Sequence, residues 1–343
     1  MLETILNLHF DPKEGSTHWL ELLRQKGLHR RDLSLETLHL LGPMDMDALR
    51  HKPISDFIPQ SLKGQMGTMM LAETGGTTGS PCRRVYLEQE FQAAFVDPWR
   101  AAVQRFHFPQ GGCWLFVGPS GPHIIGQAAR AFARATGSLE PFAIDCDVRW
   151  IKQQQPQSMG YRLYMDHLIS QAMNCINQQE ITSLFTTPPL LLELGAEMSI
   201  GQRQRIHGIH TGGMSQDNET TGKLVALFPH AVILPGFGNS LCGVCFEREQ
   251  QPGEPSVFYP SDPALDLRLI PLPVQEGEQP RLTEIVAEGE RGRVMFHRFD
   301  QSFLLLNMLE RDTAMRVVTH GREGFTDVQP VSFDQQKNMA GVY

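Results

Sequence analysis

The residues between 73 and 81 have the composition of an anion-binding loop. They read Glu-Thr-Gly-Gly-Thr-Thr-Gly-Ser-Pro. Glycines let backbone N–H groups converge on phosphate oxygens, and threonine hydroxyls add short donors at the same place. An ordinary flexible surface loop has a similar composition, so composition alone does not decide between the two. The segment identifies a set of candidate phosphate ligands: Thr74, Gly75, Gly76, Thr77, Thr78 and Gly79.

Short strands are expected on both sides of this loop. Residues 67–72 form an apolar run, and residues 84–87 alternate in polarity as a strand does. A Walker phosphate loop needs GxxxxGK[ST] before a helix, and a dinucleotide-binding fingerprint needs GxGxxG. The loop contains neither pattern. It is therefore predicted to join two strands.

A second glycine-containing segment follows a short predicted strand. The strand ends in Gly212-Gly213-Met214. Glycine leaves the main chain open to close approach by another group, because no side chain stands in the way. His207 and His210 on this strand are spaced HxxH, which places them on opposite faces and disfavours a shared metal.

A third segment combines a buried strand over residues 231–235 with an aromatic and glycine-containing turn over residues 236–240. The pair Cys242 and Cys245 follows directly as a CxxC. Such a pair is half of a zinc site or a redox pair in some proteins, but no second CxxC or HxxxH accompanies it. We expect structural thiols and no metal.

The intervening elements alternate between strand and helix. A strand over residues 113–117, a glycine loop over 118–123 and an alanine-rich helix over 124–136 form a βα unit of a layered α/β fold. A stripe of Phe and Trp side chains at helical steps predicts one long core-facing helix over residues 88–107. Periodicity and capping residues also predict helices over 16–27, 34–38 and 161–177, a strand and helix over 183–194, a strand over 265–270 and a hairpin over 290–311.

Bulk properties describe an ordinary globular chain. It has 343 residues, a formal net charge of −8 and 41% hydrophobic residues. The length predicts two domains or one large α/β domain with subdomains. The acidic balance, without a basic patch, argues against a nucleic-acid partner. We expect a cytoplasmic protein with no membrane partner, since neither a signal peptide, a membrane span nor a secreted disulfide framework is evident.

The phosphate-loop segment resembles the signature of the adenylate-forming enzymes, which include acyl-CoA synthetases, peptide-synthetase adenylation domains and luciferases. Ser80 stands where that signature usually has lysine. The order of the segments is similar to the phenylacetate-CoA ligase branch. The resemblance implies a layered αβαβα core domain over residues 1–343, lacking a mobile C-terminal domain. Its parts would be a phosphate loop over 73–81, an adenine and acyl region over 113–245 and a ribose-binding hairpin over 290–312.

The same resemblance implies roles for individual residues. Leu241 stands where the family has a magnesium-binding glutamate, so Mg²⁺ would be weakly bound or held by ATP alone. Ser240 and Thr74 would act at the reacting centre, and Asp312 would accept both ribose hydroxyls. The residues implied at the adenine are Gly212, Gly213, Met214, Phe237, Gly238 and Asn239. Those implied at the acid are Gly118, His123, Gly236 and Gly238, although a lone histidine is more often structural.

The implied activity is ATP-dependent conversion of an aromatic carboxylic acid to its acyl-adenylate. After Asp312 only residues 313–343 remain, and such a truncated core resembles atypical adenylating proteins of phenazine antibiotic pathways that act towards D-alanylgriseoluteic acid. The acid would then be a phenazine, and the acyl group would pass to a partner enzyme such as an aldehyde-forming reductase. A homodimer is compatible with this reading. The alternative is a catalytically degenerate carrier that only binds an aromatic acid.

Overall fold

The computed structural model describes residues 2–76, 79–155, 157–214, 216–249, 254–273 and 278–331. Two candidate phosphate ligands, Thr77 and Thr78, lie outside the described residues. The chain divides into two compact units. The first unit contains Met1–Glu73, Cys82–Ala93 and Pro260–Phe333, and the second contains Thr74–Pro81 and Ala94–Tyr259.

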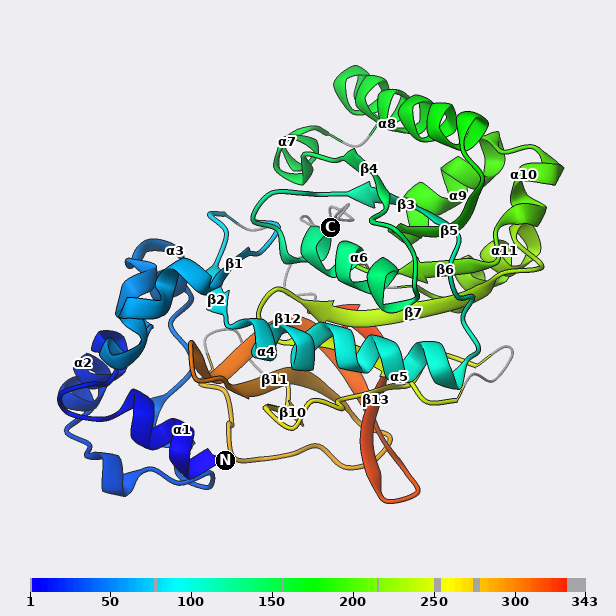
Figure 1. Ribbon diagram of the computed structural model, residues 1–343. Helices are drawn as coiled ribbons and strands as arrows, with labels where there is room; N and C mark the ends of the chain where they lie inside the picture. The colour runs from blue at the N-terminus through cyan, green and yellow to red at the C-terminus, as the bar shows by residue number, and fades with distance from the viewer. Residues whose placement is uncertain are drawn as a thin grey trace. The chain divides into compact units, whose positions relative to one another are not determined.

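The second unit is built on a parallel sheet (Figure 1). In spatial order its strands are β4 (Phe142–Asp145), β3 (Cys113–Gly118), β5 (Ile181–Thr186), β6 (Gly208–Thr211) and the first half of β7 (Val232–Asn239). The chain runs from β3 to β4 on one side and then crosses to β5 on the other side of β3. This reversal is the topological switch point at which open α/β sheets commonly bind ligands.

Helices cover both faces of this sheet. Alternate residues of a strand point to opposite faces, so Leu115 and Val117 face one layer while Trp114 and Phe116 face the other. Leu115 and Val117 pack with α8 (Met159–Gln178), α9 (Pro188–Glu197) and α11 (Asn218–Leu227). The opposite layer contains α5 (Asp97–Arg105) and α6 (Ile124–Ala135), whose Trp99 and Phe132 rings stack at 4.8 Å. The short helices α7 (Val148–Gln153) and α10 (Ile200–Arg205) complete this part.

The second half of β7 changes its partner. Residues Gly236 to Asn239 pair antiparallel with β8 (Gly243–Glu247), which in turn pairs with β9 (Phe258–Tyr259). The prediction of a turn over residues 236–240 was therefore wrong, because the glycine-containing segment is extended. Glycine allows this pairing, since a Cβ added at Gly238 would lie 2.1 Å from the Gly243 carbonyl oxygen.

The predicted long helix over residues 88–107 is interrupted by a wider turn. It consists of α4 (Glu88–Phe91), the π-helical turn η5 (Gln92–Val96) and α5. Pro98 at the start of α5 has no N–H to donate to the preceding turn, which favours a change of helical register there. The aromatic stripe is core as predicted, with Phe91, Phe95 and Trp99 buried.

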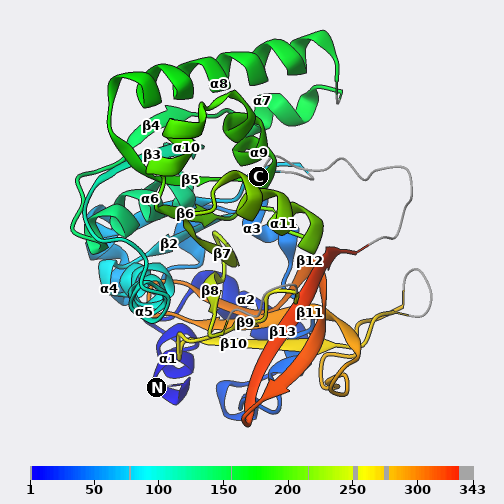
Figure 2. The same cartoon turned by 90° about the vertical axis from the view of Figure 1, so that its right-hand side faces the viewer.

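The first unit contains an antiparallel sheet of β10 (Leu265–Ile270), β11 (Arg291–Phe299), β12 (Leu304–Thr319) and β13 (Arg322–Pro330), which lie side by side in Figure 2. The predicted hairpin is confirmed, but β12 continues past Asp312 to Thr319. The sequence did not predict β13. The pair β1 (Met70–Glu73) and β2 (Arg83–Tyr86) is antiparallel, as expected for strands on either side of the loop.

Short helices complete the first unit. Helix α2 (Thr17–Lys26) ends as predicted at Gly27, whose left-handed conformation (φ 65°) suits glycine. The helix predicted over residues 34–38 was wrong, because the chain instead forms the 3₁₀ turn η2 (Leu38–Leu41) before Gly42. The other elements are α1 (Leu2–His9), α3 (Met46–His51), η1 (Arg30–Asp32), η3 (Ile54–Asp56) and η4 (Gln60–Thr68). No helix in the described ranges is long and apolar enough to cross a bilayer.

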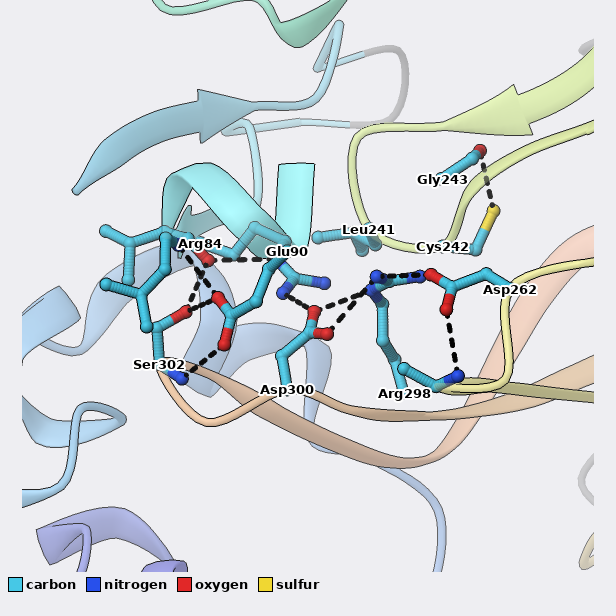
Figure 3. Close-up of polar contacts among 12 residues, drawn as sticks. Arg84, Glu90, Leu241, Cys242, Gly243, Asp262, Arg298, Asp300 and Ser302 are labelled. Carbon is cyan, nitrogen blue, oxygen red and sulfur yellow. Dashed lines mark hydrogen bonds and ion pairs between the residues drawn. The ribbon is translucent and has the colours of Figure 1, made fainter. Parts of the chain in front are cut away.

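A buried network of charged side chains lies within the first unit (Figure 3). Asp300 Oδ2 accepts from Arg84 Nη2 at 2.5 Å and from Arg298 Nε at 2.6 Å. Arg298 Nη2 also donates to Asp262 Oδ2 at 2.8 Å. Both arginine side chains have 0% exposure, so their charges depend on these carboxylates rather than on water.

Glu90 extends this network from α4. Its carboxylate accepts from the backbone N–H groups of Leu87 and Ser302 at 2.8 and 2.9 Å, and the Ser302 hydroxyl also contacts it. Burial, together with the neighbouring negative charge of Asp300, raises the pKa of Glu90. The hydrogen bonds of Glu90 and Asp300 connect β2 and α4 with the turn between β11 and β12.

Candidate functional site

The carboxyl edge of the parallel sheet in the second unit collects most of the predicted site residues. Parallel strands end at one edge, and β3, β5 and β6 end at Gly118, Thr186 and Thr211. The loops that follow these strands contain the glycine segments predicted to contact ligands. The site is described strand by strand below.

The loop after β3 is fastened to the loop after β4. The Gly118 carbonyl accepts from Cys146 N–H at 3.1 Å, and Ser120 N–H donates to Asp145 Oδ1 at 2.9 Å. His123 is the residue before α6, and its side chain makes no capping hydrogen bond to that helix. These contacts hold the Gly118 to His123 loop at the sheet edge.

A small pocket opens beside this loop, with a volume of about 170 Å³. Its walls include Phe116 on β3 and, in the loop and α6, Ser120, Gly121, Gly126, Gln127 and Arg130. Gly126 fits here because an added Cβ would lie 2.9 Å from the Pro119 carbonyl oxygen. The predicted acid-binding residues Gly118 and His123 belong to the same loop but do not line this pocket.

The end of β5 carries a polar residue that the sequence analysis did not select. Thr186 Oγ1 donates to the Val117 carbonyl at 2.8 Å, which joins β5 to β3 at the switch point. Thr187 follows it and is fully buried, and its hydroxyl makes no hydrogen bond to any described residue. Pro188 and Pro189 at the start of α9 carry no N–H groups, so this helix end is a poor anion site.

The end of β6 lies against the middle of β7. Thr211 pairs with Pro235, and a Cβ added at Gly212 would lie 4.0 Å from the Gly236 carbonyl oxygen. Gly213 is exposed and has a positive φ of 79°, which makes the chain turn away after Gly212. The structure therefore brings together Gly212 and Gly236, which the sequence assigned to adenine and to the acid.

The β7 residues predicted at the nucleotide have defined neighbours. Phe237 is half-buried, and its ring centroid lies 6.1 Å from that of Phe258. Asn239 Oδ1 accepts from Leu241 and Cys242 N–H groups at 2.8 and 3.0 Å, so this side chain stabilises the turn before β8. Ser240 in this turn is buried. The predicted ligand contacts of Phe237, Asn239 and Ser240 stay predictions.

The turn before β8 offers no evident metal ligand. Leu241, the residue that the sequence resemblance implies in place of a magnesium-binding glutamate, is 2% exposed. Cys242 and Cys245 are both buried, and Cys242 Sγ lies 3.4 Å from the Gly243 carbonyl oxygen (Figure 3). No cluster of three or more His, Cys, Asp or Glu residues suited to a metal occurs in the part of the chain that the structure describes.

Two glycines of the phosphate-loop segment adopt backbone conformations that other residues rarely adopt. Gly76 and Gly79 both have positive φ angles, 62° and 141°. A Cβ added at Gly76 would lie 3.0 Å from the Gly79 carbonyl oxygen, so these two described glycines approach each other closely. Contacts of Thr74 and Gly75 with phosphate stay predictions.

Asp312 belongs to the first unit, whereas the other predicted ligand residues belong to the second. It lies within β12 opposite Pro330 of β13, and burial raises the pKa of its carboxyl group. The positive charge of the nearby Arg311 opposes this effect and favours the charged carboxylate. Its role at the ribose stays a prediction.

His210 is a further residue at this edge that the sequence analysis did not assign to the site. Its Nδ1–H donates to the Leu234 carbonyl at 2.7 Å, and burial lowers the pKa of its imidazole to about 4. His207, three residues earlier, is exposed and precedes β6, so the predicted opposite faces of the two histidines stay a prediction. The local sequence gave no signal for His210, because its neighbours come from other strands and helices.

No family model and no curated protein matches the sequence. Solved structures of 2-hydroxyisobutyryl-CoA ligase do match. The ligase with 2-HIB-AMP and CoA in the thioesterification state gives a TM-score of 0.69 at 12% identity, over 96% of this chain and 66% of the ligase. Its open conformation with 2-HIB-AMP and CoA gives 0.68 at 11%, over 95% and 71%. Its postadenylation state with R3-HIB-AMP gives 0.67 at 12%, over 95% and 64%.

The chain thus spans about two thirds of the length of the ligase that it matches. Identity is low, so the likeness concerns the arrangement of the backbone. The mixed α/β fold predicted from the sequence is confirmed: the chain has the fold of an adenylate-forming ligase over nearly all of its length.

Proposed function

We propose that this protein activates a carboxylic acid with ATP. A carboxylate oxygen of the acid attacks the α-phosphorus, the bond to the β-phosphate oxygen breaks, and acyl-AMP and pyrophosphate leave. The observation that carries the proposal is the close approach of Gly212 and Gly236 at the carboxyl edge of the parallel sheet, the edge at which open α/β sheets commonly bind ligands. The fold shared with a ligase whose structure contains an acyl-AMP supports the same reading.

The residues act by binding and orienting the reactants. Thr74 and the glycines of its loop hold the phosphates, and Ser240 donates a hydrogen bond at the reacting centre. Gly212, Gly213 and Met214 line the adenine with Phe237, Gly238 and Asn239, while Gly236, Gly238 and the Gly118 to His123 loop contact the acid. In-line displacement at the α-phosphorus needs alignment of the reactants and stabilisation of charge, and it needs no covalent enzyme intermediate.

Magnesium fits this site poorly as a protein-bound ion. The buried Leu241 offers no oxygen ligand, and Mg²⁺ prefers carboxylate and phosphate oxygens. We propose that the ion arrives with ATP, bound to its phosphates. No step of the reaction is assigned to a protein ligand of the metal.

The acid is proposed to be aromatic, with a phenazine carboxylic acid as the specific candidate. Phe116 forms one wall of the pocket beside α6, and its ring lies 5.2 Å from that of Phe185 on β5. Aromatic walls favour a planar aromatic ligand. The activated acyl group would pass to a downstream enzyme, for which a reductase that yields an aldehyde is our proposal.

A carrier without catalysis is the second candidate. Its support is the pair of substitutions at the phosphate site, Ser80 for lysine and the buried Leu241 for glutamate. Both remove charge that would stabilise a phosphoryl-transfer transition state. A carrier would bind the acid without needing ATP.

Carboxylate-dependent exchange of labelled pyrophosphate into ATP separates the two functions. The panel comprises benzoic, phenylacetic and phenazine carboxylic acids. Thr74→Val removes a predicted phosphate donor, and we expect a roughly tenfold or greater loss of exchange. Thr68→Val is the matched control, because Thr68 is exposed and its hydroxyl donates only to the nearby Gln65 carbonyl. Asp312→Ala tests the predicted ribose contact in the same assay.

Adenylation is supported if exchange depends on one acid of the panel. Exchange should also fall in Thr74→Val and stay unchanged in Thr68→Val. Acid binding without exchange, measured by calorimetry, would favour the carrier. Thermal stabilisation by ATP gives an independent reading, since a ligand that binds only the folded state raises its apparent stability.

A further inference from the structure

His210 is a neutral acceptor in an aromatic surrounding. Four rings of the second unit lie around its imidazole, with centroids between 4.3 and 5.5 Å away. They belong to Trp99, Phe132, Phe185 and Phe246. The side chain is 2% exposed, and burial without a charged partner keeps it neutral at pH 7.

The hydrogen bond to Leu234 fixes the tautomer. A carbonyl oxygen only accepts, so the proton must be on Nδ1 of His210. Nε2 of a neutral imidazole then carries a lone pair. Within the described residues this nitrogen makes no hydrogen bond.

The free edge of the imidazole faces the two glycines. A Cβ added at Gly236 would lie 2.9 Å from His210 Cε1, and one added at Gly212 would lie 3.8 Å from Nε2. The unpaired acceptor is therefore adjacent to the surface where the proposed function places the ligand. A neutral imidazole nitrogen with a lone pair can accept a hydrogen bond from a donor on a bound ligand.

We propose that His210 Nε2 selects aromatic acids that carry a hydrogen-bond donor, such as a phenolic hydroxyl or a ring N–H, over acids that lack one. This inference rests on the proposed function and defines its substrate class more closely. Adenine also carries a donor, its amino group. Nε2 of His210 lies beside Gly212, assigned to adenine, and Cε1 lies beside Gly236, assigned to the acid, so the test measures acid binding without ATP and ATP affinity separately.

The test compares binding of matched acids by calorimetry, without ATP. Each hydroxybenzoic acid isomer is paired with the fluorobenzoic acid of the same substitution, because fluorine is similar in size and cannot donate. We expect at least one hydroxy acid to bind about 5- to 100-fold more tightly than its fluoro partner, as for a hydrogen bond to a buried acceptor. His210→Leu should reduce this ratio to about 1, and His210→Gln, which retains an acceptor, should restore part of it.

A second variant keeps the imidazole and tests its surroundings. Gly212→Ala adds a methyl group in ordinary contact with Nε2 and meets no closer atom, so the variant should fold. Its hydroxy-to-fluoro affinity ratio should fall because the methyl group covers the acceptor. His207→Leu is the control, since this exposed histidine, three residues before His210, should leave the ratio unchanged.

Imidazole nitrogen NMR supplies a reading that is independent of affinity. Wild-type His210 should show an unprotonated Nε2 whose resonance moves when the preferred hydroxy acid is added and does not move with its fluoro partner. A protonated Nε2, or a ratio near 1 for every pair in the wild type, would overturn the inference and leave adenylation intact. His210→Leu could instead lose affinity for ATP while its hydroxy-to-fluoro affinity ratio stays unchanged. That result would also overturn the inference, because the group that donates to Nε2 would then be the adenine amino group. Adenylation itself would fail only in the exchange assay.

Discussion

Replacing Asp300 by asparagine should destabilise the first unit strongly. The Asp300 carboxylate accepts hydrogen bonds from Arg84 and Arg298 at 2.5 and 2.6 Å, and both guanidinium groups are fully buried. Asparagine keeps the shape of the side chain but removes its charge. Breaking a buried ion pair in this way costs about 3–5 kcal/mol, because the remaining charge stays desolvated. Arg298 keeps its ion pair with Asp262 at 2.8 Å, so we expect the loss in the free energy of unfolding to lie at the lower end of this range, about 3 kcal/mol.

Urea unfolding followed by circular dichroism measures this loss, and hydrogen exchange of peptides from β11 and β12 locates it. Asp47→Asn is the matched control, because Asp47 is exposed and pairs with Arg50 in the same unit at 3.1 Å. An exposed pair of this kind contributes less than about 1 kcal/mol. Arg84→Met combined with Asp300→Asn should cost less than the sum of the single changes, since the two residues share one interaction. Equal losses for Asp300→Asn and Asp47→Asn would refute the reasoning.

Three further predictions concern stability. Gly238→Ala should lower the free energy of unfolding by more than about 2 kcal/mol, because the added Cβ would overlap the Gly243 carbonyl. Gly222→Ala is the control, since Gly222 has open space around it and the change should cause no such loss. Thermal melts compare the two variants. Asp45→Ala should cost about 1 kcal/mol in the same melts, since Asp45 Oδ1 accepts from two backbone N–H groups at the start of α3; no change would contradict that capping role. Unfolding free energy, followed by urea titration, should fall as the pH drops from 6.5 toward 4. The folded state keeps certain histidines neutral with pKa values of about 4, whereas the unfolded chain protonates them below 6.5. The histidines with lowered pKa values are His9, His18, His210 and His297. An unfolding free energy that does not change between pH 6.5 and 4 would contradict this prediction.

The sequence predicted elements whose signal is local. Apolar runs of strand length gave β3, β5 and β10, and the glycine after residue 26 gave the end of α2, where the left-handed conformation suits glycine. Periodicity gave α6 and α8 within two residues at each end. These elements could be predicted because burial and capping leave their pattern in adjacent residues.

The missed elements depend on partners that are distant in sequence. Residues 236–239 look like a turn, yet they are extended because β8 pairs with them. β13 has exposed residues at both ends and little alternation, so only its pairing with β12 identifies it as a strand. In the site, the proximity of Gly212 to Gly236 follows from the register of β6 and β7. The Leu234 carbonyl on β7 fixes the proton on Nδ1 of His210 and so leaves Nε2 as an acceptor, and no spacing along the chain reveals this contact.

The contact between Gly238 and Gly243 has a consequence for the divergence of related chains. Gly243 has a positive φ of 97°, and a Cβ on it would lie 2.7 Å from the Ala94 carbonyl oxygen. Backbone atoms cannot move aside as a side-chain rotamer does, so a single substitution at either glycine is incompatible with the hairpin. Purifying selection would retain both glycines even in a descendant that had lost its ligand. Invariance of Gly238 across an alignment would therefore report the hairpin and would give no information about a ligand.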